Sequence, residues 1–291
     1  MTEAMTLYSR LATAGEFIDG SDGRIFVLLR APPGARVGVL VVPPFAEEMN
    51  KCRRMITELA HRLARLGIAV VVPDLFGTGD SAGEFSDGRW RSWQGDIQHA
   101  GSWCETRGIR LAGLLGIRLG AALAASAATI GRVPGFDRTV LWQPVFNGSK
   151  FVAQFLRLRA AASMTGSGPR ESVNDLKKRL VGGETIEVAG YELSGTLVAE
   201  LDALEVPERL PEQLGRVHWM EIQRDGSVPA PTPTTQLVES TRRAGGAVEF
   251  QVLRGEPFWT STEIVINEAV LEATANCFAG LTSFGSPAGW T

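Results

Sequence analysis

The stretch Ile109-Arg-Leu-Ala-Gly-Leu-Leu-Gly-Ile-Arg-Leu-Gly-Ala-Ala-Leu-Ala-Ala-Ser-Ala-Ala128 decides the fold of this chain. It begins as an apolar run with the length of a buried strand, turns at Gly116-Ile-Arg-Leu-Gly120 and continues into an alanine-rich helix. The turn brings the strand end so close to the helix start that a Cβ at either glycine would clash. The small residues Ala121, Ala122 and Ala125 let the helix lie close to a sheet. The stretch therefore predicts a strand, a tight turn and a helix packed on the sheet.

Arg118 stands at the centre of this turn, where the strand ends of a parallel sheet converge. A guanidinium stays protonated at physiological pH and offers no lone pair with which to attack a substrate. The turn therefore has the geometry that presents a reactive side chain, but the residue it presents is not a nucleophile.

Strands and helices alternate on both sides of this stretch. Apolar strands are predicted at 25–30, 37–42, 68–72, 139–142, 217–222 and 248–253, and helices at 50–66, 90–107, 234–243 and 263–278, with Asn50 as the cap of the first helix. Strands that are apolar throughout indicate a mostly parallel, doubly wound α/β sheet with helices on both faces. Residues 147–212 break the alternation, so we expect them to form a mainly helical cap inserted into a core made of 1–146 and 213–291.

The composition is that of an ordinary globular protein. The 291 residues are 44% hydrophobic and 21% charged, and the net charge of −3 argues against a nucleic-acid partner. Cys52, Cys104 and Cys277 are odd in number and lack metal-ligand spacing, which favours free thiols in a reducing cytoplasm. We expect no signal peptide, no membrane span, no metal and no cofactor, and we leave open a homodimer or a protein partner.

Three segments resemble those of α/β-hydrolases. Asp74-Leu-Phe-Gly-Thr-Gly-Asp-Ser-Ala-Gly83 is similar to their D-x-x-G-x-G-x-S-x-G segment, Gly116 to Gly120 matches the frame of their nucleophile elbow, and Asp225-Gly-Ser-Val-Pro229 resembles their acid loop. The resemblance covers about residues 25–280 and implies an α/β-hydrolase fold with a cap.

A narrower resemblance rests on three short motifs. Pro44-Phe-Ala-Glu-Glu-Met-Asn-Lys-Cys-Arg53, the arginine-centred elbow and Glu256-Pro-Phe-Trp259 are similar to the exosortase A system-associated hydrolase 2 family. This resemblance implies a cytoplasmic bacterial protein that accompanies exopolysaccharide and protein-sorting loci and is classed as a hydrolase by homology.

The catalytic triad of this fold is incomplete. A serine hydrolase needs Ser, then Asp or Glu, then His, and the equivalent positions here hold Arg118, Asp225 and Glu256. Arginine replaces the nucleophile, and no histidine follows His218 to act as the base, so two of the three triad members are absent. Asp225 is either a remnant acid or a loop anchor, and Glu256 is either a substitute base or a solvated carboxylate. We interpret His61, His99 and His218 as structural, and the Ser81 hydroxyl as bonded to its own loop backbone.

Two hypotheses remain open for Arg118. In the first, the elbow has relaxed and Arg118 pairs with Glu47 or Glu48 as a plug. In the second, the guanidinium, the helix N-terminus and the remaining backbone donors form a site for a small anion. The candidate binding residues are Phe45, Ala46, Glu47, Glu48, Arg118, Leu119 and Gln143.

Three functions compete on this basis. The preferred one is a pseudo-hydrolase that binds an anionic small molecule. The alternative is an active ester, thioester or peptide hydrolase in which Glu47, Glu48 or Asp225 acts as general base on water and Arg118 stabilises the negative charge. The third, an ordinary serine hydrolase suggested by the fold, conflicts with the missing triad members.

Overall fold

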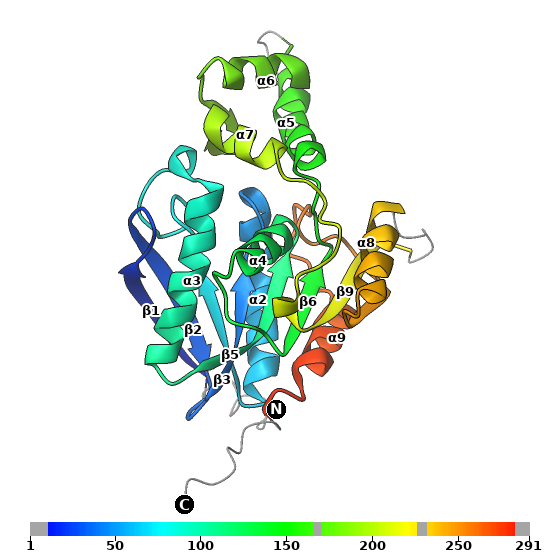
Figure 1. Cartoon of the computed structure of the whole chain (residues 1–291). Coiled ribbons are helices and arrows are strands. Elements are labelled where there is room, and N and C mark those ends of the chain that lie inside the picture. Colours follow the sequence, from blue (N-terminus) through cyan, green and yellow to red (C-terminus); the bar gives the residue numbers. More distant parts are fainter. Residues whose placement is uncertain (1–10, 166–169, 226–231, 283–291) are drawn as a thin grey trace, which may run out of the picture.

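The computed structural model describes residues 11–165, 170–225 and 232–282. Within them, eight strands form one sheet in the order β1-β2-β4-β3-β5-β6-β9-β10 (Figure 1). The six strands from β4 to β10 in this order run parallel, and β2 is antiparallel to both of its neighbours. This is the mostly parallel α/β-hydrolase sheet that the sequence predicts.

The bounds of the strands differ little from the prediction, except at the start of the chain. They are β1 (Ala12–Asp19), β2 (Arg24–Ala31), β3 (Val37–Val42), β4 (Ile68–Pro73), β5 (Arg110–Ile117), β6 (Arg138–Trp142), β9 (Arg216–Gln223) and β10 (Val248–Arg254). β1 was not predicted, because nearly all of its side chains are exposed at the sheet edge and no apolar alternation marks it.

Helices cover both faces of the sheet. They are α2 (Glu47–Ala64), α3 (Trp90–Thr106), α4 (Leu119–Thr129), α8 (Thr232–Arg243) and α9 (Glu268–Phe278). α2 and α9 pack on one face, and α3, α4 and α8 pack on the other. β3 shows why its run is apolar throughout: Val39 and Val41 point into the first layer, and Leu40 and Val42 point into the second.

The segment between β6 and β9 lies over the carboxyl ends of the parallel strands (Figure 1). It contains α5 (Gly148–Thr165), α6 (Val173–Val181), a hairpin of β7 (Ile186–Val188) and β8 (Tyr191–Leu193), and α7 (Gly195–Asp202). We propose the predicted bounds, 147–212, for this cap.

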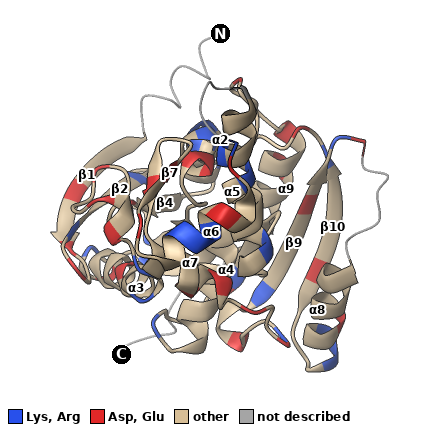
Figure 2. Cartoon of the chain, turned by 90° about the horizontal axis from the view of Figure 1, so that it is seen from above, with Lys and Arg blue, Asp and Glu red and all other residues tan. Residues whose placement is uncertain are grey.

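Hydrogen bonds that involve side chains connect the cap to the core. Asn50 donates to the Tyr191 hydroxyl at 2.9 Å, the backbone N–H of Trp90 donates to Glu200 at 2.7 Å, and Arg89 contacts Ser194. On α6 of the cap, basic and acidic residues lie side by side (Figure 2).

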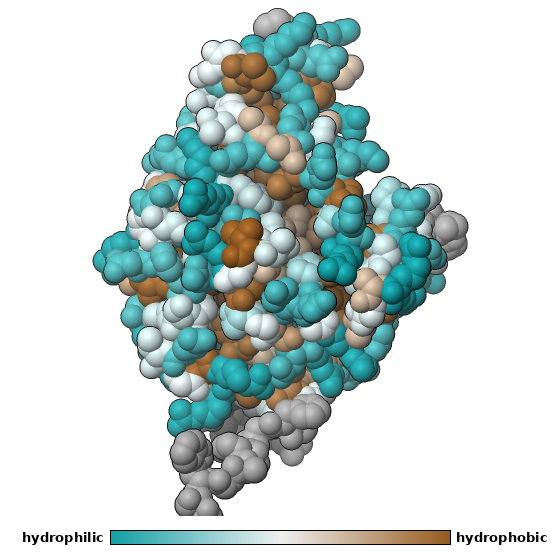
Figure 3. All heavy atoms as spheres, in the orientation of Figure 1, coloured by the Kyte–Doolittle hydropathy of each residue, from teal (hydrophilic) through white to brown (hydrophobic). Residues whose placement is uncertain are grey.

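Hydrophilic residues cover most of the molecular face shown in Figure 3, and hydrophobic residues appear there in small groups. Such scattered apolar groups are normal on a protein surface. In the described part of the chain, no helix combines the length and the apolar character needed to cross a membrane.

Candidate binding site at the strand–helix elbow

The elbow between β5 and α4 keeps a strained backbone. Arg118 has φ 55° and ψ −121°, its N–H donates to the carbonyl of Trp142 at 3.0 Å, and its own carbonyl accepts from Ala121 and Val145. A non-glycine residue in such a conformation costs about 1–3 kcal/mol. The elbow has therefore not relaxed, which contradicts that part of the plug hypothesis.

The two glycines of the turn are required by close backbone contacts, as the sequence predicts. A Cβ at Gly116 would lie 2.8 Å from the Cα of Ala121. A Cβ at Gly120 would lie 2.4 Å from the carbonyl oxygens of both Val42 and Pro43. The helix consequently starts directly against the end of β3.

Three strained residues meet around this elbow. Besides Arg118, Ala46 has φ 51° before α2, and Gln143 has φ 43° after β6. The remaining non-glycine residue with positive φ in the described ranges is Ala189, in the turn of the cap hairpin. Strained residues that cluster at the ends of three neighbouring strands indicate a functional site.

The Arg118 side chain is partly buried and contacts groups from three segments of the chain. Its Nε donates to Glu48 Oε1 at 3.1 Å, and its Nη1 donates to the carbonyl of Gln143 at 3.3 Å. Its Cζ lies 5.0 Å from the ring centroid of Trp259. The exposed fractions of the Arg118 and Glu48 side chains are 13% and 9%. Arg118 thus forms the buried ion pair of the plug hypothesis on an unrelaxed elbow.

Glu47 and Glu48 reach this region because α2 begins earlier than predicted. The helix starts at Glu47, directly after the strained Ala46, and Asn50 lies inside its first turns and does not cap it. Both carboxylates therefore occupy the helix N-terminus, where the macrodipole favours negative charge.

Carboxylates outnumber the guanidinium at this site. Burial raises the pKa of Glu48 and of Glu47, and in both cases the positive charge of Arg118 opposes the shift. Burial also raises the pKa of Glu221 on β9, which accepts a hydrogen bond from the Trp219 indole at 2.9 Å and is stabilised as a carboxylate by Arg118. A bound anion would have to displace Glu48 and approach two further carboxyl groups.

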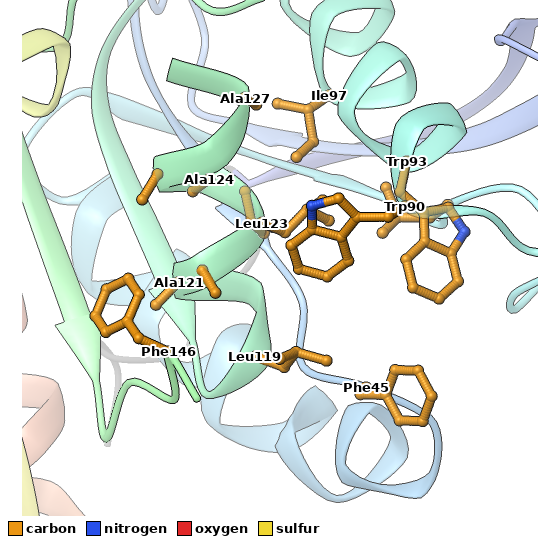
Figure 4. Close-up of a cluster of buried hydrophobic side chains, with 14 of the residues drawn as sticks. Phe45, Trp90, Trp93, Ile97, Leu119, Ala121, Leu123, Ala124, Ala127 and Phe146 are labelled. Carbon is orange, nitrogen blue, oxygen red and sulfur yellow. The ribbon is translucent and has the colours of Figure 1, made fainter. Parts of the chain in front are cut away.

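A small apolar pocket adjoins the elbow. Ala46, Leu119 and Gly120 line it beside aromatic rings of Phe45, Trp90 and Trp93. Figure 4 shows these rings grouped with Leu119 and Leu123 of α4. Tyr191 closes one side from the cap hairpin, so the cap contributes to the wall. Because Leu119 and Gly120 begin α4, their backbone N–H groups are donors without a partner inside the helix.

The structure brings most of the predicted binding residues together, and the two acidic triad positions are exposed. Phe45, Ala46 and Leu119 line the pocket, and Glu48 and Gln143 contact Arg118. Glu256 instead pairs with Arg224 at 2.9 Å, and both side chains are exposed. Asp225 is an exposed residue after β9, and the rest of its predicted acid loop, 226–229, lies outside the described residues.

Two residues of the site were not predicted. Trp259 lies in the loop after β10. A triad would need a histidine in this loop, and the sequence offers only Glu256 as a substitute. Glu221 is 3% exposed within β9. The sequence contained an indication that Glu221 belongs to the site, because a charged residue inside an otherwise apolar strand is rare unless it has a partner.

The three histidines lie on helices and strands of the core, and their structural role stays a prediction. His61 lies on α2, His99 on α3 and His218 on β9, where its Nδ1 lies 3.3 Å from Glu249. The Ser81 hydroxyl donates to the carbonyl of Asp74 and accepts from the N–H of Phe26, so the prediction for Ser81 is confirmed. In the parts of the chain that are described, no three His, Cys, Asp or Glu side chains gather as a metal site would require.

The sheet order, the elbow and the cap define an α/β-hydrolase fold whose nucleophile position holds arginine. Solved structures agree. Est1E from Butyrivibrio proteoclasticus, solved with ferulic acid bound, has a TM-score of 0.62 at 14% identity over 92% of this chain and 99% of its own. A putative hydrolase from Agrobacterium vitis S4 has a TM-score of 0.60 at 19% identity over 93% and 98%.

A monoglyceride lipase from Saccharomyces cerevisiae has a TM-score of 0.58 at 11% identity, over 92% of this chain and 94% of its own. No family model matches the chain, and no curated protein matches its sequence. At these identities the likeness to solved structures shows the fold alone.

Proposed function

We propose that this chain is a binding protein with an α/β-hydrolase fold, which holds a small and largely apolar ligand in the pocket at the elbow and has no serine hydrolase activity. One observation carries the proposal: the buried Arg118–Glu48 pair fills the nucleophile position, while an apolar pocket remains beside it. Apolar pockets with few polar groups are typical of small-molecule sites.

The residues at the triad positions support the absence of serine hydrolase chemistry. Arg118 cannot act as a nucleophile, and its guanidinium is already bound by Glu48 and by the carbonyl of Gln143. An indole, that of Trp259, lies against it where a base would be needed, and an indole N–H is only a donor.

The chemistry of the pocket favours an apolar ligand body. Phe45, Phe85, Trp90 and Trp93 offer flat aromatic surface, and the N–H groups that start α4 offer hydrogen bonds to one polar end. The sequence predicts an anionic ligand held by Arg118. The pairing with Glu48 opposes that part of the prediction, so we propose that neutral ligands bind at least as well as anionic ones.

The alternative function is hydrolysis with a carboxylate as general base. Its support is the raised pKa of Glu48, since a catalytic base works best when its pKa lies near the working pH. The link to exosortase systems is likewise a proposal, which rests on the three motifs of the narrower resemblance.

A neutral dye and an ester series test the proposal together. Nile red fluorescence should report one saturable site, and p-nitrophenyl esters from acetate to octanoate should not be turned over. Thr78→Trp should weaken dye binding at least about tenfold, because Thr78 lines the pocket and an indole there fills it.

Thr106→Trp is the matched control. Thr106 and Thr78 each donate their hydroxyl to the carbonyl three residues before, but Thr106 is exposed at the end of α3. Absence of saturable dye binding would refute the binding function. Ester turnover that Glu48→Gln abolishes would establish the alternative enzyme.

A further inference from the structure

A second cavity lies between strand β2 and helix α2. We call it the β2–α2 groove. Alternate residues of β2, namely Phe26, Leu28 and Arg30, line one wall, since side chains two apart share a face of a strand. Ile56 and Arg53 of α2 line the other wall. The groove therefore combines apolar side chains with two guanidinium groups, and Thr57 and Asp74 complete its polar lining.

Neither guanidinium has a carboxylate partner among the residues that the structure describes. The Nε of Arg53 donates to the side-chain oxygen of Asn50 at 3.2 Å, and no ion pair within 4.0 Å involves Arg30 or Arg53. Arg118 differs in this respect, because Glu48 already neutralises it. The groove thus holds two guanidinium groups and one carboxyl group, that of Asp74, whereas the single guanidinium at the elbow is paired with Glu48.

The two arginines also act on each other. Burial, and then the like charge of Arg53, lower the pKa of Arg30. The third charged residue in the lining, Asp74, accepts a hydrogen bond from the N–H of Asp80 at 3.0 Å. Burial raises the pKa of Asp74, and the positive charge of Arg53 opposes that shift without forming an ion pair within 4.0 Å. An anion placed between the guanidinium groups would relieve their repulsion, because each could donate charge-assisted hydrogen bonds to it.

We propose that the β2–α2 groove binds a small amphipathic anion, whose carboxylate or phosphate head lies between Arg30 and Arg53 and whose apolar chain lies along Phe26, Leu28 and Ile56. This site is distinct from the elbow pocket and does not depend on the function proposed for it. Pro43 and Met49 line both cavities and separate them.

Titration calorimetry with octyl phosphate, octanoate and octanol on the full chain tests the proposal. Octyl phosphate and octanoate should bind saturably, and octanol should bind at least about tenfold more weakly, because it lacks the charge that the guanidinium groups recognise. Arg30→Gln and Arg53→Gln should each weaken octyl phosphate by roughly tenfold or more, as expected for a lost hydrogen bond between charged groups.

Arg54→Gln is the control for net charge. Arg54 follows Arg53 on the same helix but pairs with Glu58 at 2.7 Å and does not line the groove, so its variant should bind within about twofold of the wild type. An equal loss in Arg54→Gln, or no loss in Arg30→Gln and Arg53→Gln, would overturn the proposal.

Thr78→Trp distinguishes ligand binding in the elbow pocket from ligand binding in the β2–α2 groove. It fills the elbow pocket and should leave octyl phosphate affinity unchanged if the ligand lies in the β2–α2 groove. Loss of octyl phosphate binding in this variant alone would place the ligand in the elbow pocket and reject the groove. If Thr78→Trp loses Nile red binding and keeps octyl phosphate binding, the groove proposal is supported. This result does not depend on whether the function proposed for the elbow pocket is correct.

Discussion

The indole of Trp259 lies over the guanidinium of Arg118, with 5.0 Å between Cζ and the ring centroid. In a serine hydrolase of this fold, the nucleophile elbow and the loop after the last strand would supply the nucleophile and the base. Here the same two positions meet as a cation and an aromatic ring, a contact worth about 1–2 kcal/mol when buried. The contact stabilises the elbow and cannot transfer a proton from it.

We expect the wild-type chain and Arg118→Ser to be equally inert toward fluorophosphonate probes. These reagents need an activated serine, and restoring serine at the elbow still leaves Trp259 where a histidine is required. Intact-mass spectrometry after prolonged incubation measures the labelling. Stoichiometric labelling of either protein would revive serine hydrolase chemistry.

Arg118→Ser should lower the free energy of unfolding by about 3–5 kcal/mol near neutral pH, because it leaves the buried Glu48 carboxylate without its partner. Glu48→Gln in the same chain should recover part of that loss, since no carboxylate then needs a cation. Urea unfolding of the wild type, the two single variants and the double variant gives the coupling, expected at about 1–3 kcal/mol. Additive losses would mean that the pair contributes little.

The loss of folding stability caused by Arg118→Ser should depend on pH. Burial raises the folded-state pKa of Glu48 above its unfolded value, so stability falls as pH rises through the interval between the two values. Removing Arg118 removes the attraction that opposes this shift and moves the folded-state pKa higher. The stability difference between wild type and Arg118→Ser should therefore be smaller at about pH 5 than at about pH 8. Thermal melts at both pH values check the sign, and a constant difference would argue against Glu48 as the cause.

Gly120→Ala should destabilise the chain by about 1–3 kcal/mol or more, because the added methyl group would meet two backbone carbonyl oxygens at 2.4 Å. Gly135→Ala is the matched control, since no atom lies within 4 Å of a Cβ there and its φ is not positive. We expect Gly135→Ala to be neutral or slightly stabilising in the same unfolding measurement. Equal effects of the two changes would show that the elbow can relax.

Ala46→Gly should raise the free energy of unfolding by about 1 kcal/mol. Relief of a strained φ of 51° exceeds the entropic cost of a new glycine, which is about 0.5–1 kcal/mol. Ala60→Gly, in the interior of α2, carries the entropic cost without the relief and should destabilise. A loss of stability in both variants would show that Ala46 is not strained in solution.

Much of this architecture could be predicted because it depends on local patterns. Continuous apolar runs gave the parallel strands, and the glycines at 116 and 120 gave the elbow, since close backbone contacts leave no choice of residue. The missing triad could also be read directly, because no histidine follows His218.

The details of the site could not be predicted, because they depend on contacts between distant segments. Glu48 and Trp259 are 211 positions apart, and only the folded sheet brings both to Arg118. The capping preference of asparagine predicts that α2 starts at Asn50, whereas the strained Ala46 begins the helix one turn earlier. Without that shift, the choice between Glu47 and Glu48 as the partner of Arg118 stayed open.

Two aromatic residues in the wall of the elbow pocket also form the interface between the cap and the core, which we call the joint. Phe45 contacts Phe151 and Phe155 of α5 with ring centroids 5.4 and 5.2 Å apart, and Phe85 contacts Tyr191 at 4.9 Å. Phe45 and Phe85 therefore serve the pocket and the joint at once, so ligand affinity and cap docking must be linked. A ligand that packs against these rings should slow amide hydrogen exchange across the cap hairpin, which supplies Tyr191 to the wall, and across α5, which contributes no residue to the pocket lining.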